Sequence, residues 1–129
     1  MPDEDLALVR RLVDAWNDND WTQMAAALDD DVVGVPPEGW PEGGSDAHGP
    51  KEILRQFERL KDSWEEERVE PREIREEGGE IVVDAVWVTR GHGSGIELQV
   101  PVSIRVTARG GKIIRAEFGV DDSGARPPG

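Results

Sequence analysis

One histidine and two carboxylates are the best candidates for acid–base chemistry in this chain. His48 closes a loop rich in glycine and proline, and its imidazole could act as a general base or hydrogen-bond a ligand if that loop folds over a cavity. Glu117 lies in the last apolar segment and Asp121 ends it, so either carboxylate could transfer protons. Most such side chains are surface groups, so an exposed position without a chemical role is the alternative for all three.

Two further polar residues are weaker candidates. Asp84 interrupts an apolar strand and could be catalytic if it points inward, but pairing across a contact between two sheets suits its position better. His92 lies in a predicted hairpin turn, far from His48, and no carboxylate stands at metal-ligand spacing. The chain also has no cysteine. We therefore predict no metal site and no cofactor.

The aromatic composition points to an apolar ligand or a large core. There are five tryptophans, two phenylalanines and no tyrosine. An indole offers a large apolar surface and one hydrogen-bond donor, which suits a flat aromatic or polycyclic molecule. Trp40 and Trp87 are the strongest candidates for contact with it, and core packing is the alternative for Trp87. The predicted ligand-binding residues are Trp16, Trp40, Trp87, Ile104 and Phe118.

The last third of the chain predicts a β-hairpin that forms one wall of the core. Apolar residues alternate from Ile96 to Val106, as in a strand with one buried face, and alternate again from Ile114 to Val120. A three-residue loop, Arg109 to Gly111, would place both apolar sets on one side, so we expect it instead of a two-residue Gly-Gly turn. On this alignment Glu117 lies on the polar face, and a loop one residue different would turn it into the cavity.

Helical and strand patterns upstream supply the rest of the fold. Apolar spacing predicts three helices, at 6–16, 20–28 and 50–64, and strands at 32–35, 68–77 and 80–89. Lys61 is expected on the solvent-exposed side of the third helix, among other charged residues. The strand at 80–89 is apolar on both sides, so we expect one face on the helices and the other against a partner subunit. This order indicates an α+β fold, with three helices packed into a curved antiparallel sheet.

Length and charge exclude several classes of protein. The chain has 129 residues and a formal net charge of −13, which repels nucleic acids and anionic membranes. We predict one domain, residues 1–121, and a flexible tail, residues 122–129. The acidic start lacks the pattern of a signal peptide, and no apolar run is long enough to span a membrane. We expect a cytoplasmic protein.

Several short strings, spread from Leu6 to Ala125, carry a family resemblance. They are Val13-Asp14-Ala15-Trp16, Asn19-Asp20-Trp21, Asp31-Val32-Val33, Pro36-Pro37, His48-Gly49, Gly93-Ser94-Gly95 and Gly111-Lys112-Ile113-Ile114. By the order and spacing of these strings, the chain resembles the nuclear transport factor 2-like superfamily, and in particular its SnoaL-like, polyketide-cyclase-related branch. The resemblance implies a cone-shaped α+β barrel with a mainly apolar cavity, commonly in a homodimer that packs through its sheets. Members include isomerases, cyclases, epoxide hydrolases, dehydratases and proteins that only bind, so fold alone does not settle function.

The residues of a ketosteroid isomerase are missing from this sequence. That reaction needs a carboxylate base and an oxyanion-binding site formed by a tyrosine and a protonated carboxylic acid. This chain has no tyrosine, Val35-Pro36-Pro37 stands where the base would lie, and Ser103 or Ile104 stands where the acid would lie. We reject isomerase activity of that type.

Two functions of different classes remain after this exclusion. One is a module that binds a small hydrophobic or polycyclic molecule without catalysis. The lack of tyrosine and the lack of an obvious inward-facing acid slightly favour this function. The other is a cofactor-independent enzyme of the cyclase or isomerase kind. A cavity lined only by apolar groups would support binding, whereas a filled cavity with a large hydrophobic sheet face would indicate a protein-interaction scaffold.

Overall fold

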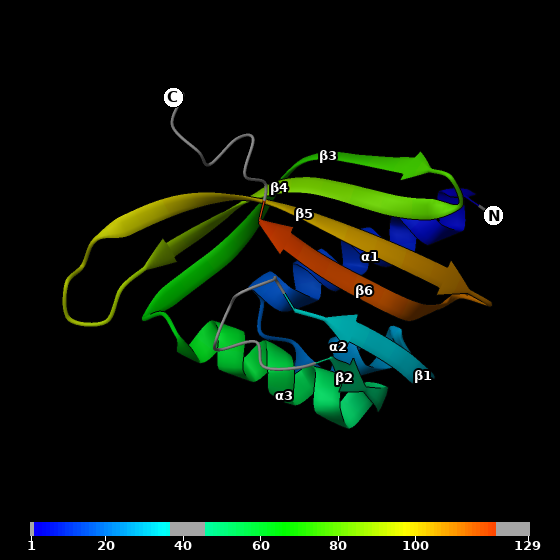
Figure 1. Cartoon of the computed structure of the whole chain (residues 1–129), viewed down its shortest axis with the longest axis horizontal. Coiled ribbons are helices and arrows are strands. Elements are labelled where there is room, and N and C mark those ends of the chain that lie inside the picture. Colours follow the sequence, from blue (N-terminus) through cyan, green and yellow to red (C-terminus); the bar gives the residue numbers. More distant parts are fainter. Residues whose placement is uncertain (1, 37–45, 121–129) are drawn as a thin grey trace.

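The computed structural model describes residues 2–36 and 46–120 (Figure 1). Its three helices are α1 (Pro2–Asn17), α2 (Trp21–Ala26) and α3 (Gly49–Asp62). Its six strands are β1 (Leu28–Val35), β2 (Ala47–His48), β3 (Glu66–Glu77), β4 (Glu80–Arg90), β5 (Glu97–Arg109) and β6 (Lys112–Val120). The predicted order of helices and strands is confirmed, with the short strand β2 added. The predicted tail at 122–129 lies outside the described residues.

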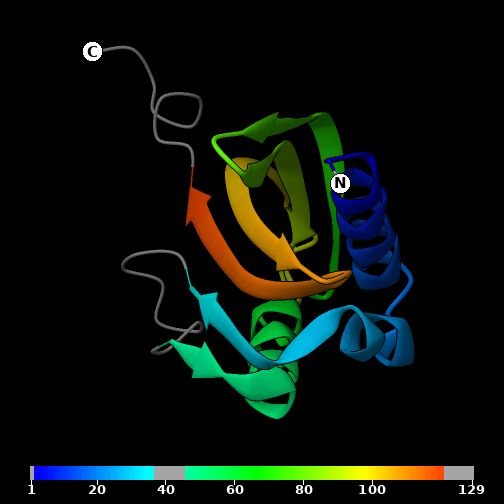
Figure 2. The same ribbon diagram turned by 90° about the vertical axis from the view of Figure 1, so that its right-hand side faces the viewer.

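The strands form one mixed and mainly antiparallel sheet in the order β2-β1-β6-β5-β4-β3, in which only β1 and β6 run parallel. Figure 2 shows this sheet curling around the space that α1 and α3 cover, without closing into a barrel. The α+β cone fold is therefore confirmed. Because β3, β4, β5 and β6 are joined in sequence by hairpins, the concave face of the sheet is built from consecutive segments.

Helices α1 and α3 pack on the sheet, and α2 packs against both of them. Val9 on α1 and Phe57 on α3 are almost fully buried, as is Met24 on α2. The side chain of Asp20 caps α2 by accepting a hydrogen bond from the backbone N–H of Gln23, at 3.1 Å. Gly34 lets α3 approach β1 closely, because a Cβ atom there would lie 2.8 Å from Oε1 of Gln56.

The turn between β5 and β6 has two residues, so the expected three-residue loop is wrong. Arg109 pairs with Lys112, which leaves only Gly110 and Gly111 in the turn. Their φ angles are 61° and 78°, the left-handed region in which glycine is favoured over other residues. A Gly-Gly turn of this kind matches the twist of the two strands better than the longer loop would.

A β-bulge restores the alignment that the shorter turn would have lost. The register of β5 and β6 shifts between Thr107 and Ala108, so that Ile113 lies opposite Ala108 while Ile114 has no partner. Beyond the bulge, Ile104 faces Phe118 on the core side of the sheet. The predicted common apolar face is therefore present around Ile104 and Phe118, with a different cause. The prediction is wrong at the strand's start, where Ile96 and Leu98 are 62% and 47% exposed, and at the bulge, where Ile113 is fully buried instead of Ile114.

The outer face of β4 is partly buried within the chain itself. Val82 and Val88 on this face are buried, and the side chain of Asp84 forms an ion pair with Arg75 of β3. Asp84 thus has its ionic partner within its own subunit, and the sheet contact expected for it is not needed to pair its charge.

Candidate functional site

The strongest concentration of buried polar groups is an ion pair between the end of α3 and the start of β3. Lys61 Nζ bonds to a carboxylate oxygen of Glu67, and the two side chains are only 8% and 7% exposed. The expectation that Lys61 lies on the exposed side of its helix is wrong. Lys61 stands four residues after Phe57 and one after Leu60, both buried, so helix geometry carries it to the core side.

Two indoles also donate hydrogen bonds to the Glu67 carboxylate. Trp16 at the end of α1 and Trp87 on β4 both donate their Nε1–H to Oε1 of Glu67, at 2.6 and 2.9 Å. Lys61 also donates to the backbone oxygen of Trp16 at 2.8 Å, and its Nζ lies 4.3 Å from the centre of that residue's ring. We call Lys61, Glu67, Trp16 and Trp87 the Glu67 cluster.

The two charges of the Glu67 cluster form an ion pair that is largely shielded from water. Burial lowers the pKa of the Lys61 ammonium from its usual value, while the hydrogen bond and the negative charge of Glu67 act in the opposite direction. A carboxylate has about four acceptor positions, and Glu67 uses three of them on Lys61 and the two indoles. One acceptor position is left for a proton or a ligand group.

A small apolar cavity adjoins the Glu67 cluster on the concave side of the sheet. Its volume is about 30 Å³, and every described residue that lines it is apolar. The lining is Val9, Leu12, Val13, Trp16, Phe57, Val69, Val83, Ile104, Val106, Ala116 and Phe118. Trp16, Phe57 and Phe118 form a three-way aromatic contact, with ring centres 5.0 to 6.3 Å apart.

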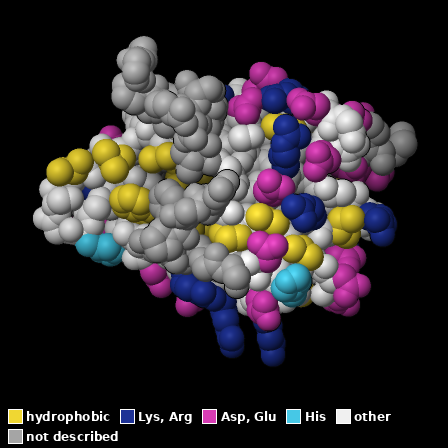
Figure 3. All heavy atoms as spheres, in the orientation of Figure 1, with side chains coloured by type: hydrophobic (Ala, Val, Ile, Leu, Met, Phe, Trp, Pro, Cys, Tyr) yellow, Lys and Arg dark blue, Asp and Glu magenta, His cyan; other side chains and the backbone are white. Residues whose placement is uncertain are grey.

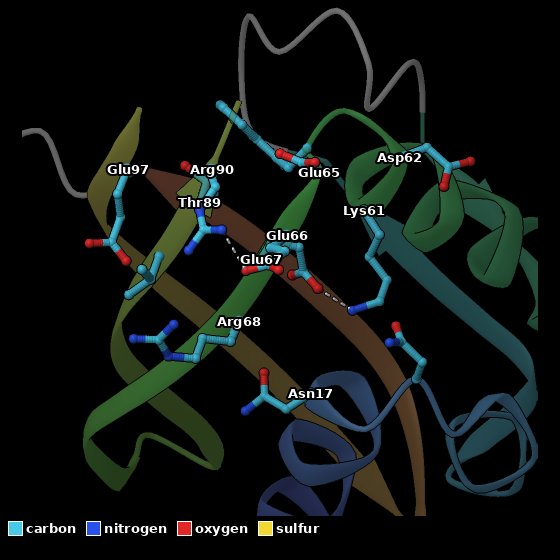
Figure 4. Close-up of a pocket in the computed structure, with 13 residues that line it drawn as sticks. Asn17, Lys61, Asp62, Glu65, Glu66, Glu67, Arg68, Thr89, Arg90 and Glu97 are labelled. Carbon is cyan, nitrogen blue, oxygen red and sulfur yellow. Dashed lines mark hydrogen bonds and ion pairs between the residues drawn. The ribbon is translucent and has the colours of Figure 1, made fainter. Parts of the chain in front are cut away.

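On its other side the cluster borders an open polar groove of about 510 Å³ (Figure 4). The groove lies between the ends of α1 and α3 and the paired strands β3 and β4, and Figure 4 shows Lys61 and Glu67 pointing toward each other within its lining. Lys61 and Glu67 line the groove, whereas Trp16 lines the cavity, so the Glu67 cluster separates the two.

Three of the predicted ligand-binding residues, Trp16, Ile104 and Phe118, line the apolar cavity. Trp87 packs in the same core and belongs to the Glu67 cluster. Trp40 lies outside the described residues. A ligand-binding role for these five residues stays a prediction.

The predicted acid–base residues are not brought together around the cavity. His48 is exposed on β2 at the start of α3, where its backbone N–H donates to Glu52 at 2.9 Å. Glu117 lies on the outer face of the sheet, opposite Arg105 and paired with Arg115 at 3.0 Å. Asp121 lies outside the described residues. A catalytic role for these three residues stays a prediction.

The sequence reasoning missed Lys61 and Glu67, two charged residues whose side chains are only 8% and 7% exposed. Lys61 could have been found from its spacing to Phe57, and Glu67 from its position two residues before the buried Val69 on the same face of β3. In the described ranges no group of three or more metal-ligating side chains comes together. No helix within those ranges is long and apolar enough to cross a membrane.

Solved structures with this fold come from several kinds of protein. TerC, crystallised with polyporic acid, is 22% identical with a TM-score of 0.81, and 94% of each chain is covered. A nuclear transport factor 2-like protein of unknown function from Burkholderia pseudomallei is 23% identical, with a TM-score of 0.82 and 94% and 93% of the two chains covered. A protein described as a SnoaL-like polyketide cyclase from Jannaschia is 17% identical, with a TM-score of 0.80 and coverage of 98% and 95%.

At these identities the similarity establishes the fold alone, and a comparison with curated proteins found no match. The family is established by sequence, because the profile of the SnoaL-like domain matches residues 9–116, most of the chain. This match shows that the chain belongs to the SnoaL-like domain family, and its fold is the one seen in a nuclear transport factor 2-like protein.

Proposed function

We propose that this protein binds a small hydrophobic, aromatic molecule in the apolar cavity and does not transform it. The observation that carries the proposal is the lining of the cavity, to which the described residues contribute no carboxylate and no imidazole. Apolar walls with a few polar groups nearby are typical of small-molecule sites. TerC, which has the same fold, was crystallised with polyporic acid, so a protein of this shape can be obtained with a small-molecule ligand.

The ligand must displace a side chain as it enters. A volume of about 30 Å³ is the space of roughly one water molecule, far below that of an aromatic ring. Phe118 is the lining aromatic that is only half-buried, and it contacts the rings of both Trp16 and Phe57. Rotation of Phe118 would open the cavity and leave two aromatic rings to stack on the ligand.

The Glu67 cluster favours one second candidate, a cofactor-independent enzyme of the cyclase or isomerase kind. Glu67 accepts a hydrogen bond from Trp16, which lines the cavity, and keeps one acceptor position. Glu67 and Lys61 line the groove and not the cavity, so this chemistry requires the ligand to reach past Trp16. The carboxylate could then remove a proton from a carbon beside a ketone of the ligand, and Lys61 could stabilise the resulting enolate. This candidate and the first share the same ligand class.

A titration with 2-tetralone, a bicyclic ketone, tests binding. We expect saturable quenching of tryptophan fluorescence, and we expect Ala116→Leu to abolish it, because Ala116 lines the cavity and is 1% exposed. Ala25→Leu on α2, outside the cavity lining, is the matched control and should bind normally. Absence of quenching, or equal quenching in the Ala116→Leu variant, would contradict the proposal.

Deuterium exchange separates the two candidates. A binding protein leaves the rate of exchange at the carbons beside the ketone of 2-tetralone unchanged in heavy water, whereas an acid–base enzyme accelerates it. Acceleration that is lost in Glu67→Gln, while binding persists, would establish the enzyme and refute the non-catalytic proposal. The exchange is followed by proton NMR.

A further inference from the structure

The polar groove contains two buried polar atoms that have no partner. Thr89 is 1% exposed, and within the described ranges neither its Oγ1 nor the buried Nε1 of Trp64 forms a hydrogen bond. Both residues line the groove. Buried polar groups in folded proteins are nearly always hydrogen-bonded, so two unpartnered ones in a single wall indicate a missing ligand group or water.

An oxygen atom of a molecule bound in the groove could satisfy these two atoms. The indole N–H of Trp64 can only donate, so its partner must be an acceptor. The hydroxyl of Thr89 can donate or accept. A hydroxyl group of a ligand satisfies both, because it donates and accepts as well.

The charged residues that line the groove disfavour binding of an anion. All three lining cations are already paired with carboxylates, namely Lys61 with Glu67, Arg68 with Glu70 and Arg90 with Glu66. Figure 4 shows Lys61 and Arg90 directed at their carboxylate partners. Three other lining carboxylates, Asp62, Glu65 and Glu97, have no ion-pair partner in the part of the chain that the structure describes. The unbalanced charge of the groove is therefore negative.

Tryptophan adds a surface that cations favour. The ring of Trp64 lies in the groove wall and packs edge-on against Trp87, with ring centres 5.9 Å apart. An ammonium group near an indole face is attracted by the ring quadrupole, and nearby carboxylates strengthen that attraction.

From these observations we propose that the polar groove binds a small hydroxylated organic ammonium ion, such as an amino alcohol. Its hydroxyl oxygen accepts from Trp64 and bonds to Thr89, and its ammonium group is attracted by the excess negative charge of the lining. This site is distinct from the apolar cavity, and the proposal does not depend on the function proposed for that cavity.

Three small compounds test the proposal, because each has a hydroxymethyl group and they differ in the charge of the other end. Ethanolamine is a cation at neutral pH, ethylene glycol is neutral and glycolate is an anion. Each is titrated at constant ionic strength while the indole N–H signals of the protein are followed by NMR, and the Trp64 signal is assigned with Trp64→Phe. We expect ethanolamine to shift the Trp64 signal saturably, ethylene glycol to bind at least tenfold more weakly, and glycolate to leave the signal unchanged.

Two variants of similar shape check that the hydroxyl of Thr89 takes part. Thr89→Val should weaken ethanolamine binding about tenfold, the usual loss for one hydrogen bond. Thr107→Val, on β5 and outside the groove lining, should bind as the unaltered protein does. An equal response to all three compounds, no saturable shift with ethanolamine, or unchanged binding in Thr89→Val would each overturn the proposal. These readouts are independent of 2-tetralone, so failure of one proposal leaves the other standing.

Discussion

The position of Lys61 was predicted wrongly from the charge of its neighbours, although the helical spacing to buried residues gives it correctly. Charged neighbours on the third helix suggest a solvent-facing side, yet its Nζ lies over the ring of Trp16 and beside Glu67. A buried ion pair is not evidence of high stability, because the cost of removing two charges from water can exceed their attraction. Breaking such a pair on one side is costly, however, since the remaining charge is buried without a partner.

We therefore expect Lys61→Met to lower the free energy of unfolding by about 3–5 kcal/mol. The double variant Lys61→Met with Glu67→Gln should recover most of the loss, because neither charge remains and the amide oxygen can still accept from both indoles. Urea unfolding measures all three proteins.

The matched control for this pair is Arg68→Met, which breaks the exposed ion pair with Glu70. Its side chain is 56% exposed, so we expect a loss below about 1 kcal/mol. A loss of that small size for Lys61→Met as well would contradict the burial of the Glu67 cluster.

Among the elements, the hairpin of β5 and β6 combines a core face that was predicted around Ile104 and Phe118 with a turn that was not. The alternation of apolar residues required a common core face, and either a longer loop or a bulge could provide it. The structure uses a two-residue turn and a bulge at Ile114. Periodicity thus predicts the face of a strand, while the position of an irregularity depends on packing across the sheet.

The tight turn makes a specific prediction at Gly110, whose φ is 61°. No atom lies within 4 Å of a Cβ built there, so any cost of substitution comes from the backbone conformation. Gly110→Ala should destabilise the protein by about 1–2 kcal/mol, and Gly110→Asn by clearly less, because asparagine tolerates this region. Thermal unfolding compares the two, and equal losses would argue against a left-handed turn at this position.

At the scale of the whole molecule, charge dominates the surface. Figure 3 shows acidic and basic side chains intermingled over much of one face, with apolar side chains gathered near the projecting end of β4 and β5. Ile96 and Leu98 in that region are 62% and 47% exposed. Ion pairs such as Arg75 with Asp84 and Arg115 with Glu117 cover the outer sheet face. A homodimer through the sheet, which stays a prediction, would bring these charged faces together.

The net charge of −13 predicts that salt stabilises the folded chain. Raising NaCl from 0.01 to 0.1 M shortens the screening length from about 30 to about 10 Å, so repulsion among the excess carboxylates weakens. We expect the free energy of unfolding to rise by about 1 kcal/mol, the scale of surface electrostatics. Urea unfolding at both concentrations measures it, and a fall with salt would show that the surface ion pairs outweigh the repulsion.

The sequence by itself determined the fold class, the helices, most strands and the family, because apolar periodicity and short strings are local properties of the chain. It also predicted that Trp16, Ile104 and Phe118 belong to the interior. Only the tertiary structure decided that Glu67 accepts a hydrogen bond from Trp16, 51 residues away in the sequence, and that Lys61 is buried beside Glu67. Such pairings depend on how separate elements pack, and no local pattern specifies which distant partner a carboxylate will meet.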